Sequence, residues 1–489
     1  MTGLEQYFKT FREQIIGIDE VIETPYGTMP LVYADWTASG RLYAPIERKL
    51  ADDFGPFTAN THTKTSLCGN LMTSAYEEAR QIIKNHVHAG EDDVLIMTGH
   101  GMTGAVNKLQ RILGLKIHEK YKSLIKLSDE ERPVVFITHM EHHSNQTSWL
   151  ETIADVEIIP YKDEKHIDFE AFEALIQKFD KRPLKMASVT ACSNVTGLQP
   201  DYYQIAGLIH RYNGYCFVDF ACSAPYVNID MHPTDPRQQL DAVFFSPHKF
   251  LGGPGTSGVL IFNRQLYNNA VPDHPGGGTV LWTNPWKEHR YFDDIEMRED
   301  GGTPGFLQTI KTALAIKLKE QMGVENILAR EHEILDRILP AFQSIENLQL
   351  LAGDFTDRLG IISFNIEGLH HNLGVKLLND HFGIQTRGGC SCAGTYGHIL
   401  LGVDREKSKQ IVKEIEQGDT THKPGWIRLS IHPTTSEAEV AYIIKAVKEL
   451  AYNHQDWQKD YIFVNGECEH KSFDNHQTLK KMVKSMFDN

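Results

Sequence analysis

The stretch "FFSPHKFLGGPGTSGVLIF" (residues 244–262) places a histidine and a lysine between two apolar runs and a cluster of glycines. The runs "AVFFS" (242–246) and "VLIF" (259–262) are typical of buried β-strands. Lys249 therefore comes directly after a strand. A surface lysine is one interpretation, because lysines are mostly exposed. A lysine at a strand end beside a cleft is the other, and such a lysine attacks carbonyl groups to form a Schiff base.

Further continuous apolar runs lie on both sides of this stretch. They cover 94–99, 134–138, 156–161, 186–190 and 215–220. Helices are predicted between them, including one that Asp168 caps and whose apolar residues are spaced three to four apart. Continuous apolar strands with intervening helices indicate an α/β fold with a parallel sheet covered on both faces.

The pattern changes after about residue 320. The run "GIISFNIEG" (360–368) alternates more, and "WIRLSI" (426–431) is predicted to be a half-buried strand. A helix is predicted from Glu437 to about Tyr452, with a capping box formed by Ser436 and Glu439. These features indicate a smaller α+β domain, and the polar tail after it shows no pattern that assigns its structure.

Bulk composition excludes several classes of protein. The 489 residues include 64 acidic and 49 basic side chains, for a net charge of -15. An acidic chain argues against nucleic acid as the main partner. No apolar run approaches the about 18 residues of a membrane span, and the first residues lack a signal-peptide pattern. Seven cysteines, an odd and sparse number, favour reduced thiols and a cytoplasmic location.

Two glycine motifs differ in the type of element that comes after each. "GPGTSG" (253–258) matches a dinucleotide-binding pattern, but a strand comes after it instead of a helix, so we reject that interpretation. In "TGHGMTGAVNKLQRIL" (98–113), a strand runs into Gly99 and Gly101, and a helix is predicted to begin near Met102 or Thr103. The free N–H groups and the dipole at such a helix start favour an anion. A plain strand-to-helix turn is the alternative.

Two other stretches carry reactive side chains. Asp219 ends the apolar strand "CFVDF", where a carboxylate is costly unless paired, and a protonated pyridine nitrogen is one suitable partner. "TRGGCSCAGTYGH" (386–398) contains Cys390 and Cys392 near a histidine. A zinc site normally needs a second ligand pair at defined spacing, and none is evident, so we expect no metal. Two small packed residues or a mobile thiol remain as interpretations.

Four motifs, in order along the chain, together resemble one protein family. They are "THMEHHSN" (138–145), "CSNVTG" (192–197), "FVDFACSAP" (217–225) and "SPHKFLGGPGTSGVL" (246–260). From about Tyr33 to about Leu450 the chain resembles the class V aminotransferases, which depend on pyridoxal 5'-phosphate (PLP) and have fold type I. It is most similar to the cysteine desulfurases and selenocysteine lyases.

The resemblance implies a domain organisation. It implies a PLP-binding large domain over 31–320, with a mostly parallel seven-stranded sheet sandwiched by helices, and a small α+β domain over 321–455. We expect an N-terminal segment over 1–30 that packs on the small domain, and a tail over 456–489.

By the same resemblance, Lys249 forms the Schiff base with PLP and Asp219 pairs with the pyridine nitrogen. His142 would stack on the ring and shuttle protons, and Asn194 would hydrogen-bond the phenolate oxygen. The family usually has glutamine where this chain has Cys222, and a thiol is a weaker donor to that oxygen. The phosphate would be held by Gly101, Met102, Thr103, Ser246 and His248, and by Thr279 of the neighbouring subunit in a homodimer.

The resemblance also implies sulfur chemistry. In cysteine desulfurases an arginine precedes the catalytic cysteine by five residues, and Arg387 and Cys392 have that spacing. Arg428, in "WIRLSI", would bind the substrate α-carboxylate, with Arg387 nearby. The expected reaction converts L-cysteine to L-alanine and leaves a persulfide on Cys392, from which a thiol or an acceptor protein takes the sulfur.

Other functions share much of this residue set. A selenocysteine lyase, or another lyase or aminotransferase of the family, would also use Lys249 and Asp219, so the choice depends on Cys392. A PLP-binding regulator or sulfur-relay scaffold is the non-catalytic alternative.

Overall fold

The structure is a computed structural model that describes residues 3–420, 423–464 and 467–488. The chain forms two compact units. The large unit contains residues 14–16 and 37–328, and the small unit contains residues 1–13, 17–36 and 329–489. Among the described residues, no helix combines the length and the apolar character that crossing a membrane requires.

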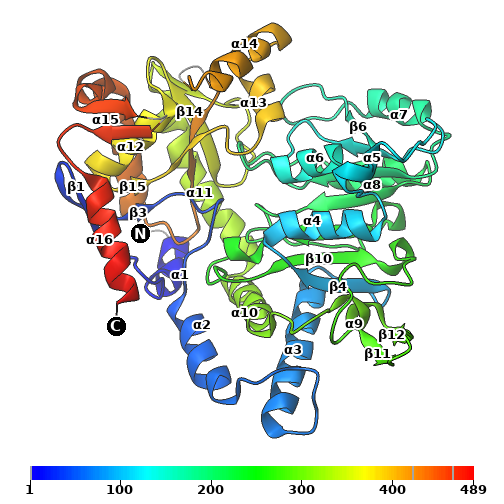
Figure 1. Cartoon of the computed structure of the whole chain (residues 1–489). Coiled ribbons are helices and arrows are strands. Elements are labelled where there is room, and N and C mark those ends of the chain that lie inside the picture. Colours follow the sequence, from blue (N-terminus) through cyan, green and yellow to red (C-terminus); the bar gives the residue numbers. More distant parts are fainter. Residues whose placement is uncertain (1–2, 421–422, 465–466, 489) are drawn as a thin grey trace. The chain divides into compact units, whose positions relative to one another are not determined.

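A seven-stranded sheet forms the centre of the large unit (Figure 1). The strands β5, β6, β7, β8 and β9 are parallel, whereas β10 runs antiparallel to both β9 and β4. In spatial order they are β4 (Asp93–Thr98), β10 (Gly258–Asn263), β9 (Ala242–Phe245), β8 (Tyr215–Asp219), β7 (Lys185–Thr190), β5 (Val134–Ile137) and β6 (Asp155–Ile158). The expected mostly parallel seven-stranded sheet is confirmed.

Helices cover the sheet because its strands are apolar on both faces. Val135 of β5 packs in one core cluster with Leu109 of α4 (Gly101–Ile112), whereas its neighbour Phe136 contacts Phe172 of α7 (Phe169–Lys178), with 5.5 Å between ring centroids. Asp168 caps α7 as predicted, because its side chain accepts the Ala171 N–H. The helices of this unit are α2 (Ala44–Lys49), α3 (Leu67–His86), α4 (Gly101–Ile112), α5 (Glu119–Lys122), α6 (His143–Leu150), α7 (Phe169–Lys178), α8 (Tyr202–His210), α9 (Ile295–Glu299) and α10 (Phe306–Met322).

Short elements complete the large unit. A hairpin pairs β11 (Val280–Thr283) with β12 (His289–Tyr291). A π-helical turn, η1 (Leu50–Phe54), follows α2. The 3-10 turns are η2 (Gly55–Phe57), η3 (Pro236–Gln238), η4 (Pro247–Lys249) and η5 (Arg264–Leu266). Of these, η4 carries the lysine that the sequence singles out.

The small unit is built on an antiparallel four-stranded sheet. Its strand order is β13 (Leu348–Leu350), β14 (Ile361–Ile366), β17 (Trp426–Ser430) and β16 (Arg387–Gly389). β17 was predicted to be half-buried, and that prediction is wrong, because all five of its residues are buried. Residues of β17 and β14 share one core with α12 (His371–Phe382) and α15 (Glu437–Trp457), which removes the expected solvent-facing side.

Helices and short strands pack around that sheet. The helix α11 (Val324–Gln343) crosses the boundary between the units in sequence, and β15 (Ile384–Gln385) pairs in parallel with β3 (Val32–Tyr33). The predicted capping box of Ser436 and Glu439 is confirmed at the start of α15, which ends at Trp457. The other helices before α16 are α1 (Gly3–Arg12), α12 (His371–Phe382), α13 (Gly394–Leu400) and α14 (Arg405–Glu416).

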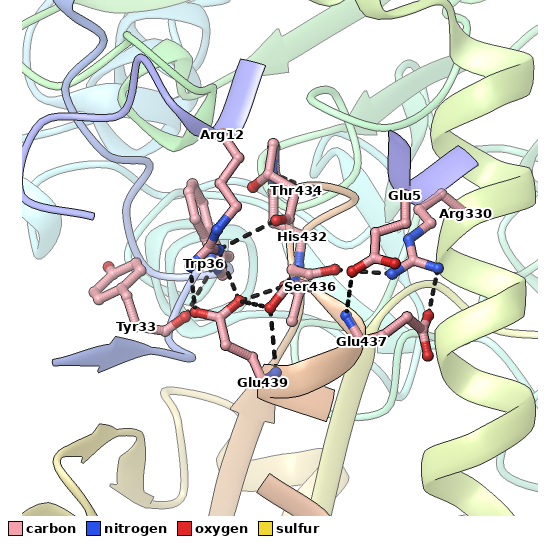
Figure 2. A network of polar contacts seen from close by, with 11 residues as sticks. Glu5, Arg12, Tyr33, Trp36, Arg330, His432, Thr434, Ser436, Glu437 and Glu439 are labelled. Carbon is pink, nitrogen blue, oxygen red and sulfur yellow. Dashed lines mark hydrogen bonds and ion pairs between the residues drawn. The ribbon is translucent and has the colours of Figure 1, made fainter. Parts of the chain in front are cut away.

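Polar contacts fasten the N-terminal segment to the start of α15 (Figure 2). The Arg12 guanidinium donates to both Glu439 carboxylate oxygens, at 2.7 and 2.9 Å. Buried Arg330 donates to Glu437 Oε1 at 2.7 Å, and the Glu437 backbone N–H donates to Glu5 Oε1 at 2.9 Å. These contacts fix the loop between β17 and α15.

Two hairpins and a last helix belong to the small unit as well. β1 (Val21–Thr24) pairs with β2 (Gly27–Pro30), and β18 (Tyr461–Val464) pairs with β19 (Glu467–His470). The turn η6 (Gln458–Asp460) precedes β18, and α16 (Asn475–Phe487) follows β19. The Tyr461 hydroxyl donates to Asp380 Oδ2 at 2.8 Å, which holds the second hairpin on α12.

Candidate active site

The parallel strands of the large unit bring the predicted cofactor residues to one edge of the sheet. Thr190 lies opposite Asp219 where β7 and β8 end, and Asp219 lies opposite Phe244 of β9. His142, Asn194 and Lys249 follow β5, β7 and β9 in the chain. The carboxyl ends of parallel strands are where α/β sheets bind ligands, so the fold itself gathers these side chains.

Asp219 is a buried carboxyl group at that edge, with 3% of its surface exposed. Burial raises its pKa to about 6, against the opposing effects of the Ala221 N–H and of the Lys249 charge. The Ala221 N–H donates to Oδ1 at 2.7 Å. A second cationic partner would hold this carboxyl ionised.

The backbone around Lys249 is tightly packed. The turn η4 begins directly after Ser246 and ends at Lys249, whose side chain is half-buried. A Cβ at Gly40 would lie 1.9 Å from the Phe250 carbonyl oxygen, so only glycine fits beside the lysine segment. The Gly40 N–H donates to the His248 carbonyl oxygen at 2.9 Å. The lysine is therefore presented by a fixed turn.

Five of the six predicted phosphate ligands lie where α4 begins. The Met102 N–H donates to Ser246 Oγ at 2.8 Å. Gly101 has φ +59°, and a Cβ there would lie 2.7 Å from Ser246 Oγ and 2.9 Å from His248 Cε1. Thr103 lies beside them, with its hydroxyl 2.6 Å from Ser144 Oγ. Burial and the Lys249 charge lower the pKa of His248 to about 4, so its imidazole is neutral at pH 7.

A buried carboxyl group that the sequence reasoning missed lies beneath this edge. Glu141 accepts the Thr190 N–H at 2.8 Å and an Asn145 side-chain N–H at 2.8 Å, and so joins α6 to the end of β7. Burial raises its pKa to about 8. Its neighbour His142 caps α6, with Nδ1 accepting the Ser144 N–H at 3.1 Å. The sequence feature that could have revealed it is the glutamate in "MEHHSN", which directly precedes the predicted cofactor residue His142.

Two further predicted cofactor residues, Cys222 and Thr279, each donate a hydrogen bond to a nearby backbone carbonyl oxygen. Buried Cys222 donates its thiol hydrogen to the Cys192 carbonyl oxygen at 2.9 Å, and Cys192 leads into the loop of buried Asn194. Thr279 is fully buried, and its hydroxyl donates to the Gly276 carbonyl oxygen at 2.7 Å. The role of Thr279 in a neighbouring subunit stays a prediction.

The predicted sulfur-carrying cysteine lies in the small unit. Cys392 is exposed, in the turn between β16 and α13. Its φ is 57° and that of Ser391 is 49°, a left-handed conformation that is uncommon for residues other than glycine. Cys390 is half-buried. No disulfide joins any of the seven cysteines, all of which lie in the described residues.

The two predicted substrate arginines lie directly opposite one another on β16 and β17. Arg428 is 3% exposed, and its Nη2 lies 2.8 Å from Asp35 Oδ1. Arg387 is half-exposed, and its Nη2 lies 3.0 Å from Asp35 Oδ2. The Cα register pairs Arg387 with Arg428. Asp35, which the sequence reasoning missed, therefore joins both guanidinium groups.

Comparison with known proteins decides the family. The family model for aminotransferase class-V matches residues 32–443, most of the chain. The chain belongs to the class-V aminotransferase family. This class-V aminotransferase is 29% identical over 384 residues to a probable cysteine desulfurase from Halalkalibacterium halodurans, covering 76% of this chain and 86% of the relative. A probable cysteine desulfurase from Staphylococcus epidermidis is 28% identical over 380 residues, with the same coverage.

Solved structures share the fold. An apo cysteine desulfurase from Thermococcus onnurineus aligns with a TM-score of 0.71 and 23% identity, covering 91% of this chain and 98% of the other. A cysteine desulfurase from Escherichia coli aligns with a TM-score of 0.68 and 19% identity, covering 92% and 98%. These likenesses confirm fold type I.

The class-V aminotransferases are PLP-dependent enzymes, and the large unit of this member fits that cofactor. The buried Asp219 suits a protonated ring nitrogen, since burial alone disfavours its charge. At the start of α4, Gly101 lets the backbone approach Ser246 and His248 closely, and the dipole of a helix start favours an anion. The roles of Asp219 and of the start of α4 in binding the cofactor stay predictions.

Proposed function

We propose that this class-V aminotransferase is a cysteine desulfurase, which converts L-cysteine to L-alanine and transfers the sulfur to Cys392. The observation that carries the proposal is the exposed Cys392 thiol, in a left-handed turn that directly follows the strand of Arg387. The curated relatives named probable cysteine desulfurase support the same reaction.

The large unit would supply cofactor binding and proton transfer. The Lys249 amine would carry PLP covalently and, once released, take the α-proton of the substrate. Asp219 would stay ionised against the ring nitrogen, and Gly101, Met102, Thr103, Ser246 and His248 would hold the phosphate. Asn194 and His142 would contact the ring. Bound PLP supplies the electron sink that makes the substrate α-carbon acidic.

The small unit would supply substrate recognition and the nucleophile. Arg428 would bind the α-carboxylate, assisted by Arg387. The Cys392 thiolate would attack the substrate sulfur, so that a sulfur–sulfur bond forms while the β-carbon–sulfur bond breaks. The carbon skeleton then leaves as alanine after protonation, and Cys392 carries one additional sulfur atom. A second thiol, or an acceptor protein, removes that sulfur and restores the cysteine.

Assembly is part of the proposal. The resemblance that identifies Thr279 as a phosphate ligand of the neighbouring subunit implies a homodimer. Coexpression of a Thr279→Ala chain with a Lys249→Ala chain tests this sharing, because one site of the mixed dimer would then have both residues and the other site neither. We expect the mixed dimer to regain activity that neither variant has alone.

The test measures alanine and sulfide together in the presence of a thiol reductant. We expect the purified enzyme to release both in equal amounts from L-cysteine, and Cys392→Ser to release neither. Cys390→Ser is the matched control, because it removes a thiol two residues away, and we expect it to retain turnover. Sulfide release by Cys392→Ser would contradict the proposal. Turnover of selenocysteine alone would favour the lyase, and PLP binding without turnover would favour the regulator.

A further inference from the structure

Asp35 is a carboxylate placed between the two substrate arginines. Its Oδ1 accepts from Arg428 Nη2 at 2.8 Å, and its Oδ2 accepts from Arg387 Nε at 3.1 Å. Its side chain is 13% exposed and that of Arg428 is 4% exposed, so the Asp35–Arg428 pair is largely shielded from water, whereas Arg387 is half-exposed. Shielded pairs of this kind interact more strongly than surface pairs do.

The backbone next to Asp35 is fixed to β17, which carries Arg428, and to β15, which ends two residues before Arg387. The Ala34 N–H donates to the Gln385 carbonyl oxygen at 3.0 Å, and the Ser430 N–H donates to the Ala34 carbonyl oxygen at 2.7 Å. Trp36 stacks on His432, with 4.2 Å between ring centroids. The contacts of Arg12 and Arg330 in Figure 2 hold the chain just beyond His432. These contacts therefore hold Asp35 in a fixed position beside Arg387 and Arg428.

The net charge of the cluster formed by Asp35, Arg387 and Arg428 affects which substrates the site binds. The guanidinium groups of Arg387 and Arg428 carry two positive charges, and Asp35 carries one negative charge. The cluster as a whole keeps one positive charge. One α-carboxylate balances that charge, whereas a second acidic group on the substrate would meet the Asp35 carboxylate without a cation of its own.

We propose that Asp35 is a specificity-determining residue that restricts the site to amino acids with one carboxylate and an uncharged side chain. It does so by occupying one of the two arginine charges. Acidic amino acids such as L-cysteine sulfinate and L-aspartate are thereby rejected. This inference rests on the proposed function, because it takes Arg428 and Arg387 as the substrate-binding pair.

The test replaces Asp35 with its uncharged isostere, Asp35→Asn. We expect the ratio of kcat/KM for L-cysteine sulfinate to that for L-cysteine to rise by roughly tenfold or more, since like charges at such sites are strongly disfavoured. The change falls mainly on KM. Asp456→Asn is the matched control, because Asp456 is also ion-paired, 2.7 Å from Lys459, but is exposed at the end of α15. A ratio unchanged within about threefold overturns the inference.

A second variant distinguishes charge balance from general disruption. Removing one cation in the same background, Asp35→Asn with Arg387→Gln, restores a net charge of one positive, and we expect it to restore rejection of cysteine sulfinate. A merely structural role for Asp35 predicts a further loss instead. If Asp35→Asn does not fold, Arg387→Gln alone tests the charge balance. This variant lowers the net charge of the cluster from one positive to zero, and the inference requires that it bind L-cysteine more weakly.

Ligand binding separates failure of this inference from failure of the proposed function. Calorimetry of the PLP-loaded protein measures the dissociation constants of L-alanine and L-aspartate without turnover. We expect Asp35→Asn to tighten aspartate relative to alanine. If the wild-type protein does not desulfurate cysteine but Asp35→Asn still tightens aspartate binding relative to alanine binding, the proposed function is wrong and the role of Asp35 stands. The reverse result defeats Asp35 alone.

Discussion

Substitution of Asp219 offers a stability measurement whose sign and size follow from the structure. Burial raises the pKa of Asp219 from 3.8 in the unfolded chain to about 6 in the PLP-free protein. The ionised form is thus disfavoured by folding, and this group's unfavourable contribution grows as pH rises from below 4 to above 6. A shift of this size amounts to about 1–2 kcal/mol at pH 5 and about 3 kcal/mol at pH 7.5.

The variant Asp219→Asn removes the titrating group and keeps the shape of the side chain. Urea unfolding of the PLP-free proteins should therefore show that the variant gains stability relative to wild type as pH rises from 5 to 7.5. The gain should be about 1–2 kcal/mol across that range. Burial, with a contribution from the Asp219 charge, raises the pKa of Glu141 to about 8, so Asp219→Asn also lowers the pKa of Glu141, which adds to the gain in the same direction.

Cofactor loading should reverse the order of stability. A protonated ring nitrogen gives the wild-type carboxylate the partner that the PLP-free protein lacks, so PLP should stabilise wild type more than the variant. The reasoning is refuted if the difference between wild type and Asp219→Asn is independent of pH from 5 to 7.5. It is also refuted if PLP stabilises both proteins equally.

Three other substitutions test separate parts of the structure. Gly101→Ala places a Cβ 2.7 Å from Ser246 Oγ at a φ of +59°, so an absorbance titration should show PLP affinity lowered by roughly tenfold or more; unchanged affinity would remove the phosphate site from α4. Ser436→Ala deletes the capping box of α15 and should lower the free energy of unfolding by about 1 kcal/mol in urea, with Ser485→Ala as the exposed control. Lys249→Ala should abolish covalent retention of PLP after borohydride reduction, as judged by mass spectrometry, and a retained label would point to another lysine.

Local patterns predicted the large unit well. Its strands are continuous apolar runs and its parallel order follows from the helices between them, so β5, β7, β8 and β9 appear near their expected positions. The start of α4 was predicted near Met102 or Thr103, and it begins at Gly101. These features depend on residues close together in sequence, which is why they are visible without a structure.

Features that depend on distant contacts escaped prediction. Asp35 and Arg428 are 393 positions apart, and nothing near Asp35 in the sequence marks it as the residue that joins Arg428 to Arg387. β17 was misjudged because its second face is covered by helices elsewhere in the chain. The tail could not be assigned because its hairpin is held by Asp380, 81 positions before Tyr461. Glu141 lies beside a recognised histidine, but its burial depends on Thr190 of another strand.

Sulfur transfer to Cys392 is tested most directly by the mass, after one turnover, of the peptide that contains Cys390 and Cys392, and by its fragment masses, which tell the two cysteines apart. The PLP-loaded enzyme is mixed with a limiting amount of L-cysteine without reductant, trapped with an alkylating reagent and digested. We expect one additional sulfur atom on Cys392, in an amount equal to the alanine formed. Alanine formed while the Cys392 peptide stays unmodified, or the extra sulfur found on Cys390 instead, would contradict it.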